Sequence, residues 1–99
     1  MIEHLVWFKL KDGTSEEDKA AMLQTLRDLK TQIPGIEHLA CGEDFCGRSN
    51  GYQIGLVVRF SSRQALEEYG PHPAHKAFGD RFRPLWDGVQ ALDFEDDRS

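Results

Sequence analysis

A phenol and two imidazoles lie within seven residues, in the segment Tyr69-Gly-Pro-His-Pro-Ala-His75. Such side chains exchange protons with bound molecules: a neutral imidazole is a general base near neutral pH, and a phenol donates a hydrogen bond to a carbonyl oxygen. Because proline is favoured at the first position of a helix, Pro73 predicts a helix capped by His72. His75 then lies in the first turn, where the helix dipole disfavours the imidazolium. The segment therefore predicts an acid–base site with His75 as the base and Tyr69 as its partner.

A further imidazole, His4, lies far away in the sequence. Residues 2–10 alternate between two faces and predict a strand, with His4, Val6 and Phe8 on one face. If helices cover that face, His4 joins a pocket beneath His75. Small-molecule pockets are mostly apolar with a few polar groups. The predicted lining residues fit that description: His4, Val6, Phe8, Met22, Leu23, Leu26, Leu56, Phe78, Trp86, Val89 and Ala91.

Each candidate also has a purely structural interpretation. His72 can serve as a helix cap without any chemistry. His4 can be a core histidine whose ring bonds to a backbone group. Tyr69 can be a packing tyrosine whose hydroxyl finds a partner inside the protein. His75 is the residue whose position at a helix N-terminus gives a specific physical reason for a functional role.

Two capping patterns and one proline predict the helices. Thr14 and Glu17 have the spacing of a capping box, so a helix begins near Ser15 and ends before Pro34-Gly35. Ser61 and Gln64 repeat that spacing and predict a short helix that ends at Tyr69. A third helix runs from Pro73 to about Trp86, bent near Gly79 and Pro84. The first helix carries one apolar stripe, which indicates core: Met22, Leu26, Leu29 and Ile33.

Besides residues 2–10, the segments 36–45, 52–60 and 89–94 predict strands, and a polar hairpin loop joins the middle two. The order is β-α-β-β-α-β with the second helix split in two. This order is typical of a ferredoxin-like α+β fold, in which helices cover one face of an antiparallel sheet.

The sheet face away from the helices is predicted to be apolar, although an exposed sheet face is usually polar. The residues expected on it are Leu5, Trp7, Val57, Leu92 and Phe94. Because a patch of this size is rarely left open to water, we expect a homodimer that packs sheet against sheet. The alternative is a monomer with scattered apolar residues on its surface.

The composition sets further limits. Hydrophobic residues make up 39% and charged residues 29%, as in a single globular domain over residues 1–99. A net charge of −5 argues against nucleic-acid binding. No apolar run approaches the ~18 residues of a membrane span, and no signal peptide is visible, so we expect no membrane contact and a cytoplasmic location. Residues 95–99 form a charged tail that we expect to be flexible.

Neither a metal nor a cofactor is expected. Cys41 and Cys46 form one close pair without a second, which is a poor zinc pattern, so we expect free thiols. The acidic residues near the C-terminus are expected to be solvated rather than to hold a cation: Asp93, Glu95, Asp96 and Asp97.

Three stretches resemble the stress-responsive α/β-barrel (Dabb) domains: His4-Leu-Val-Trp-Phe-Lys-Leu-Lys11, Phe60-Ser-Ser-Arg-Gln-Ala-Leu-Glu-Glu-Tyr69, and His72-Pro-Ala-His75. The resemblance covers essentially the whole chain and implies a dimeric α+β barrel.

Within this family the C-terminal half is similar to a plant polyketide cyclase. That resemblance implies that Tyr69 and His75 are a catalytic pair and that His4 lines the pocket. Residues 78–80, Trp86 and Asp93 also match. The sequence departs from the cyclase where pocket aromatic residues would stand, at Met22, Leu23 and Leu26, which implies a different pocket floor and a different substrate.

Three functional hypotheses follow from the residues and the resemblance. The first is a cofactor-free cyclase or lyase that closes a poly-β-keto chain by an intramolecular aldol reaction, with His75 as the base. The second is a non-catalytic stress-responsive or ligand-binding protein. The third is a haem- or quinone-handling monooxygenase on the same barrel.

Overall fold

Four strands and three helices make up the fold in the computed structural model, which describes residues 1–97. The strands are β1 (Ile2–Leu10), β2 (Ile36–Glu43), β3 (Tyr52–Phe60) and β4 (Trp86–Glu95). The helices are α1 (Glu16–Gln32), α2 (Arg63–Tyr69) and α3 (Pro73–Phe82), and a 3-10 turn, η1 (Arg83–Leu85), follows α3. The predicted ferredoxin-like order, including the split second helix, is confirmed.

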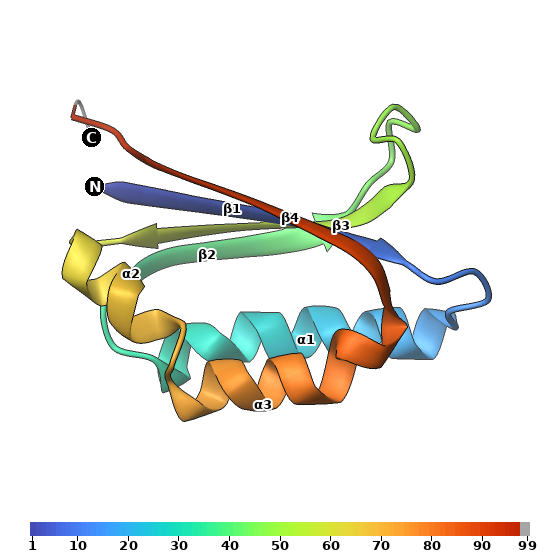
Figure 1. Cartoon of the computed structure of the whole chain (residues 1–99), viewed down its shortest axis with the longest axis horizontal. Coiled ribbons are helices and arrows are strands. Elements are labelled where there is room, and N and C mark those ends of the chain that lie inside the picture. Colours follow the sequence, from blue (N-terminus) through green and yellow to red (C-terminus); the bar gives the residue numbers. More distant parts are fainter. Residues whose placement is uncertain (98–99) are drawn as a thin grey trace.

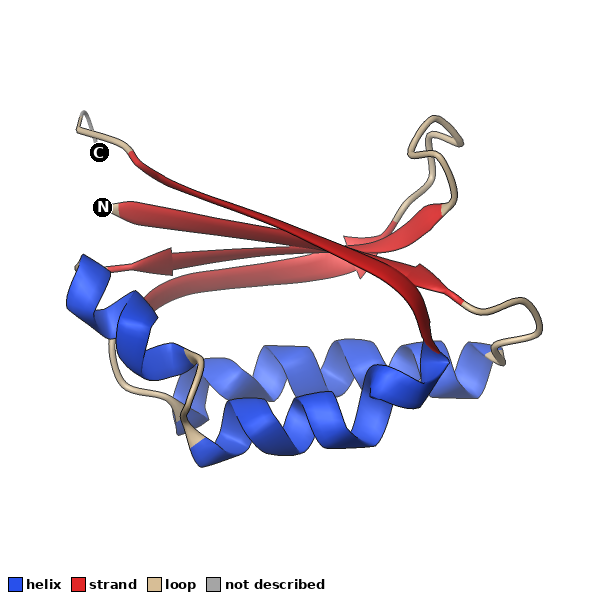
Figure 2. Ribbon diagram, in the orientation of Figure 1, coloured by secondary structure: helices blue, strands red, loops and turns tan. Residues whose placement is uncertain are grey.

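The strands form one antiparallel sheet in the order β2-β3-β1-β4. All the helices lie on one side of it, with α1 and α3 running side by side beneath the strands (Figures 1 and 2). None of the helices among residues 1–97 combines the length and the apolar character needed to cross a bilayer.

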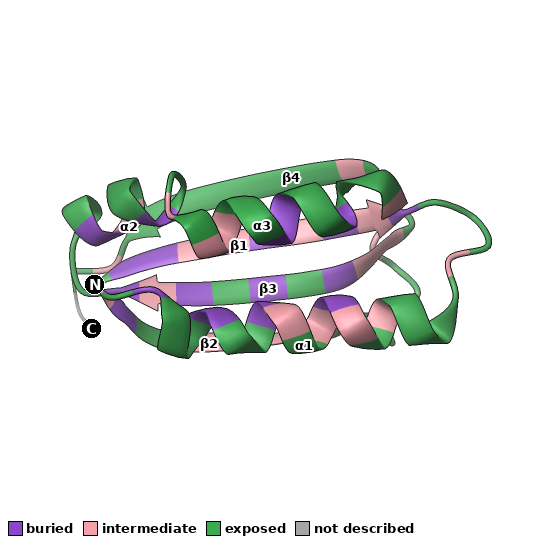
Figure 3. Ribbon diagram, turned by 90° about the horizontal axis from the view of Figure 1, so that it is seen from below, coloured by how far each residue is buried: buried purple, intermediate pink, exposed green. Residues whose placement is uncertain are grey.

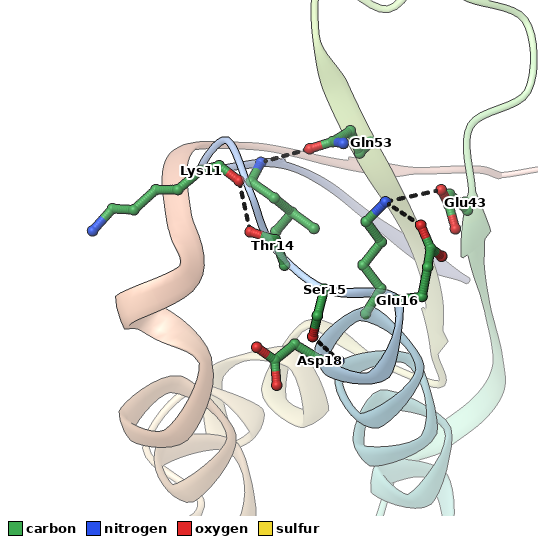
Figure 4. A network of polar contacts seen from close by, with 9 residues as sticks. Lys11, Thr14, Ser15, Glu16, Asp18, Glu43 and Gln53 are labelled. Carbon is green, nitrogen blue, oxygen red and sulfur yellow. Dashed lines mark hydrogen bonds and ion pairs between the residues drawn. The ribbon is translucent and has the colours of Figure 1, made fainter.

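The first two helices begin at caps one residue later than predicted. Ser15 caps α1, because the amide of Asp18 donates to its Oγ at 3.0 Å. The neighbouring Thr14 instead donates to the carbonyl of Lys11, which closes the preceding turn (Figure 4). In the same way Ser62 replaces Ser61 as the cap of α2. Adjacent hydroxyl residues compete for one cap, and the path of the entering chain decides which of them is used.

The beginning of α1 is also joined to the sheet. The ammonium of Lys19 lies 3.0 Å from Glu16 on the same helix and 3.5 Å from Glu43 at the end of β2 (Figure 4). At the other end, α1 stops at Gln32, two residues before Pro34, and the chain turns through Gly35, which has φ of +90°. A Cβ at Gly35 would lie 2.7 Å from the Cβ of Ala65, so this turn also packs closely against α2.

Strands β2 and β4 have other bounds than the sequence predicted. Helix α3 ends at Phe82 rather than near Trp86, because Pro84 has no N–H for a helical bond and the chain enters η1. Trp86 then begins β4, paired with Leu10. Strand β2 ends at Glu43 rather than Phe45, since the carboxylate of Asp44 accepts bonds from the Gly47 amide and the Cys46 thiol and organises the loop.

The predicted tail begins later than expected. Glu95 belongs to β4 and pairs with Ile2, and the amide of Asp96 donates to the carbonyl of Met1 at 2.9 Å. Residues 98 and 99 lie outside the described residues. Met1 and Asp96 therefore lie at the same end of the sheet (Figure 1).

The core lies between the helices and the covered sheet face. All four residues of the predicted stripe on α1 are at most 3% exposed, which confirms it as core. They pack against the inward-facing side chains of β1 and β3, such as Phe8, Leu56 and Phe60. Figure 3 shows this covered face behind α1 and α3, with buried residues on β1 and β3 and mostly exposed residues along β4.

The opposite sheet face is apolar in its centre. Leu5 pairs with Val57 on one side and with Leu92 on the other, so these side chains share that face with Trp7 and Phe94. Leu92 and Phe94 are 53% and 47% exposed. In the loop that follows β2, Phe45 is fully exposed. Cys41 and Cys46 carry free thiols.

Candidate functional site

The connection between α2 and α3 brings Tyr69 and His75 together. Helix α2 ends at Tyr69, and the amide of His72 bonds back to its carbonyl at 3.2 Å. His72 then caps α3, accepting from the amide of Ala74 at its Nδ1, as predicted. This turn places the ring of His75 4.5 Å from the ring of Tyr69, measured between centroids.

The geometry selects one tautomer of His75. Its Nδ1 lies 3.0 Å from the carbonyl oxygen of Gly70. Because a carbonyl only accepts, Nδ1 must carry the hydrogen, and the neutral ring then holds its lone pair on Nε2. Among the described residues, Nε2 has no hydrogen-bond partner. That nitrogen can therefore take a proton from a bound molecule.

The pKa of His75 is lowered from the ordinary histidine value. Burial of the half-buried ring is the largest cause; the hydrogen bond to the Gly70 carbonyl comes next and raises the pKa, and smaller electrostatic effects of His4 and Arg83 lower it. The sequence predicted a neutral imidazole from the helix dipole, whereas burial has the largest effect in the folded chain. A larger share of His75 is consequently an unprotonated base near neutral pH.

Tyr69 is 3% exposed, and its burial raises its pKa to about 12. The phenol therefore keeps its proton and acts as a neutral hydrogen-bond donor. Its ring packs against Phe60 at 5.0 Å and His4 at 5.6 Å. The hydroxyl finds no hydrogen-bond partner among the residues that the structure describes. The packing interpretation thus holds for the ring, while the hydroxyl remains available to a ligand.

His4 bonds to a carboxylate rather than to the backbone. Its Nδ1 makes a short contact with Oδ1 of Asp93, which stands opposite it on β4. The sequence interpretation missed this partner by treating Asp93 as part of a solvated acidic tail. The available signal was the alternation of β4: Asp93 lies two residues beyond Ala91, and it therefore shares the covered face with Ala91 and Val89.

His4, Tyr69 and His75 line one cavity of about 530 Å³ between α3 and the sheet. The structure brings most of the predicted site residues together around it: His4, Val6, Phe8, Leu26, Leu56, Tyr69, His75, Phe78, Trp86, Val89 and Ala91. Met22 and Leu23 do not line it. Met22 is fully buried in the core. Leu23 lies against β2, where its carbonyl accepts a hydrogen bond from the thiol of Cys41.

Five lining residues were missed by the sequence interpretation: Gly70, Lys76, Gly79, Asp80 and Arg83. The helical period offered a signal for two of them. Gly79 and Arg83 follow His75 at intervals of four residues, so all three lie along one face of the helical segment.

A second hollow, of about 550 Å³, lies at the end of the sheet near the loop that follows β2. Trp7, Gly42 and Gly55 line it, and it shares no residue with the cavity that holds His75. It is continuous with the apolar open face of the sheet and is separate from the acid–base groups.

His72 caps α3 but does not line the cavity, so its replacement should affect stability and not binding. Replacing His72 with alanine removes the side-chain cap of α3 and should lower the free energy of unfolding by about 1 kcal/mol. Urea denaturation followed by circular dichroism measures this change. Ligand binding should be retained, because His72 does not line the cavity. Unchanged stability would contradict the capping role.

The chain is similar in sequence and in fold to known proteins. The family described as the stress responsive A/B barrel domain matches residues 2–96. Olivetolic acid cyclase from Cannabis sativa is 30% identical over 95 residues, which cover 94% of each chain. A dimeric ferredoxin-like protein of unknown function from Jannaschia sp. CCS1 has a TM-score of 0.80 at 25% identity, covering 96% of this chain and 98% of that one.

A hydroxynitrile lyase from Passiflora edulis also has the same fold. Its TM-score is 0.87 at 17% identity, covering 99% of this chain and 94% of that one. At this identity the likeness concerns the fold alone.

Proposed function

The chain belongs to the stress responsive A/B barrel domain family, and on this basis we propose that it binds an apolar small molecule and transforms it by cofactor-free acid–base catalysis. The main observation is that three polar residues line one apolar cavity: His75 with its unbonded Nε2, Tyr69 with its unbonded hydroxyl, and His4, whose ring bonds to Asp93 outside the cavity lining. A base and a neutral donor side by side are what proton abstraction next to a carbonyl requires.

The reaction that fits these groups is an intramolecular aldol cyclisation. His75 Nε2 removes a proton from a carbon between two carbonyls, and the Tyr69 hydroxyl stabilises the enolate oxygen. The enolate carbon attacks a second carbonyl of the same chain and forms a carbon–carbon bond. The resulting alkoxide takes the proton back from the imidazolium. The likeness to olivetolic acid cyclase supports this reaction class.

The direct test is turnover. The protein is incubated with a panel of linear poly-β-keto acids and their thioesters, and cyclised products are followed by absorbance and mass spectrometry. We expect faster cyclisation with the protein than in buffer alone. If the protein accelerates none of them, the catalytic proposal fails.

Ligand binding without catalysis is the second candidate, and the volume of the cavity supports it. A protein that only binds would retain affinity for the same compounds without turnover. The unbonded Nε2 of His75 favours catalysis, because a general base needs a lone pair that no protein group occupies.

We propose that two copies pack through their open sheet faces. The apolar side chains of β1, β3 and β4 form one patch, with Leu92 and Phe94 about half exposed. Sheets that pack face to face bury such side chains between layers about 10 Å apart. The dimeric description of the similar Jannaschia protein supports this arrangement.

Sedimentation tests the dimer. The wild type should sediment at twice the monomer mass of 11.3 kDa, and Leu92→Asp should sediment as a monomer because a buried, unpaired carboxylate disfavours association. Gln64→Asp, on the exposed side of α2, adds the same charge and should leave the dimer intact. A wild type that sediments at 11.3 kDa at micromolar concentration would contradict the proposal.

A further inference from the structure

Arg83 occupies a position that depends on a glycine. A Cβ built on Gly79 would lie 2.8 Å from Nη2 of Arg83, which is closer than a Cβ approaches a non-bonded heavy atom. Gly79 is buried in α3 one turn after His75, and both residues line the cavity. The missing side chain at Gly79 therefore lets the guanidinium of Arg83 lie against the helix beside the cavity.

The charges around the cavity do not balance. Lys76 and Arg83 line it, and Asp80 is the one carboxylate among the described lining residues. Arg83 Nη1 lies 3.5 Å from Asp80, but both side chains are mostly exposed, so solvent screens this pair. Lys76 has no ion pair among the residues that the structure describes. The cavity therefore has a positive excess in a chain whose net charge is −5.

Two further observations place this positive charge within reach of the site. Arg83 contributes to the lowered pKa of His75, so its charge acts on the base. Trp86 lines the same cavity with its ring 5.8 Å from the Arg83 guanidinium carbon. Its buried Nε1–H has no hydrogen-bond partner among the described residues. An unpaired buried donor is unfavourable, and an acceptor oxygen that reached it would remove that cost.

We propose that the ligand of this cavity carries an anionic head group, a carboxylate or an equivalent oxyanion, which binds to Arg83 and Lys76 while its apolar body lies along Phe8, Leu56 and Ala91. A guanidinium binds carboxylates through paired hydrogen bonds, which are the strong class of such bonds. This inference rests on the binding part of the proposed function and is independent of catalysis.

The test compares two ligands with the same apolar chain, decanoate and decanol, by isothermal titration calorimetry near neutral pH. The wild type should bind decanoate about tenfold more tightly, which corresponds to one charge-assisted hydrogen bond. Arg83→Gln should bring the two affinities within about a factor of two, mainly by weakening decanoate. High salt should weaken decanoate binding and leave decanol unchanged.

The variant Gly79→Ala keeps the charge of Arg83 but moves its guanidinium away from the helix. Alanine is favoured over glycine within a helix, so the melting temperature should not fall, and the flexible end of Arg83 can move aside. The preference for decanoate should nevertheless be lost. The control is Arg81→Gln on the same helix, whose guanidinium lies over Phe82 and which lines a different groove. That variant should retain the preference.

The outcomes distinguish the two proposals. Equal binding of decanoate and decanol by the wild type, or an unchanged preference in Arg83→Gln, would overturn the anionic head group while leaving the apolar cavity as a binding site. If the wild type bound neither ligand, the binding proposal itself would fail.

Discussion

Replacement of His75 with glutamine is expected to lower the rate of cyclisation by about a hundredfold to ten-thousandfold, which is the usual contribution of a positioned general base. Glutamine retains a polar group that can bond to the Gly70 carbonyl, but it has no nitrogen that accepts a proton near neutral pH. The rate constant for the substrate that the wild type turns over fastest is the measurement.

The matched control for this experiment is His72→Ala. It removes an imidazole three residues away that caps the helix without lining the cavity. Its rate should stay close to the wild-type rate at a temperature where both proteins are folded. A His75→Gln protein with the wild-type rate would remove His75 from the mechanism.

The pH dependence of the same reaction follows from the lowered pKa of His75. The rate should rise with pH as the imidazolium loses its proton, with a midpoint below the ordinary histidine pKa of 6.5. In His75→Gln the small remaining rate should lack this step. A midpoint above 6.5 would contradict the effects of burial and of the nearby positive charges.

The free energy of unfolding should also rise with pH because of His75. The folded state favours the neutral imidazole, so this contribution to the free energy of unfolding is fully present above pH 6.5. It is lost as the pH falls through the lowered pKa, because the unfolded chain binds the additional proton first.

The second large effect is expected at Tyr69. Tyr69→Phe should lower the rate about a hundredfold, since one hydrogen-bond donor to the developing enolate oxygen is lost. The ring packing against Phe60 is retained, and the hydroxyl has no partner among the described residues. The free energy of unfolding should therefore change little. Rate and stability are measured on the same preparation.

Tyr52→Phe is the control, because Tyr52 lies beside the other hollow with Lys9 over its ring. It should keep the wild-type rate. If Tyr69→Phe also kept the wild-type rate, Tyr69 would be a packing residue, and His75 would need another donor for the enolate oxygen.

Much of the fold could be predicted because its signals are local. The cap at His72 and the helix stop at Pro34 depend on residues a few positions apart. The alternation in residues 2–10 and 52–60 assigned each side chain to a sheet face, and the pairing of β1 with β3 agrees. The boundary errors arose where two local signals compete, as between Thr14 and Ser15.

The candidate site was less predictable, because its partners come from distant segments. The sequence placed Asp93 in an acidic tail, although the register of β4 sets it opposite His4. It also placed Met22 in the cavity wall, although close packing of α1 against the sheet buries that side chain completely. Strand register and the approach of a helix to a sheet depend on the packing of the whole chain.

By itself the sequence determined the order of the elements, the inward face of each central strand and the place of His75 in the first turn of α3. Each of these depends on the chain's interactions with its near neighbours and on the separation of apolar residues from water. Only the tertiary structure decided that Asp93 bonds to His4, and that Gly79 makes room for Arg83 beside the cavity. Those contacts exist because strand register and close packing set the distances between segments that the sequence does not place side by side.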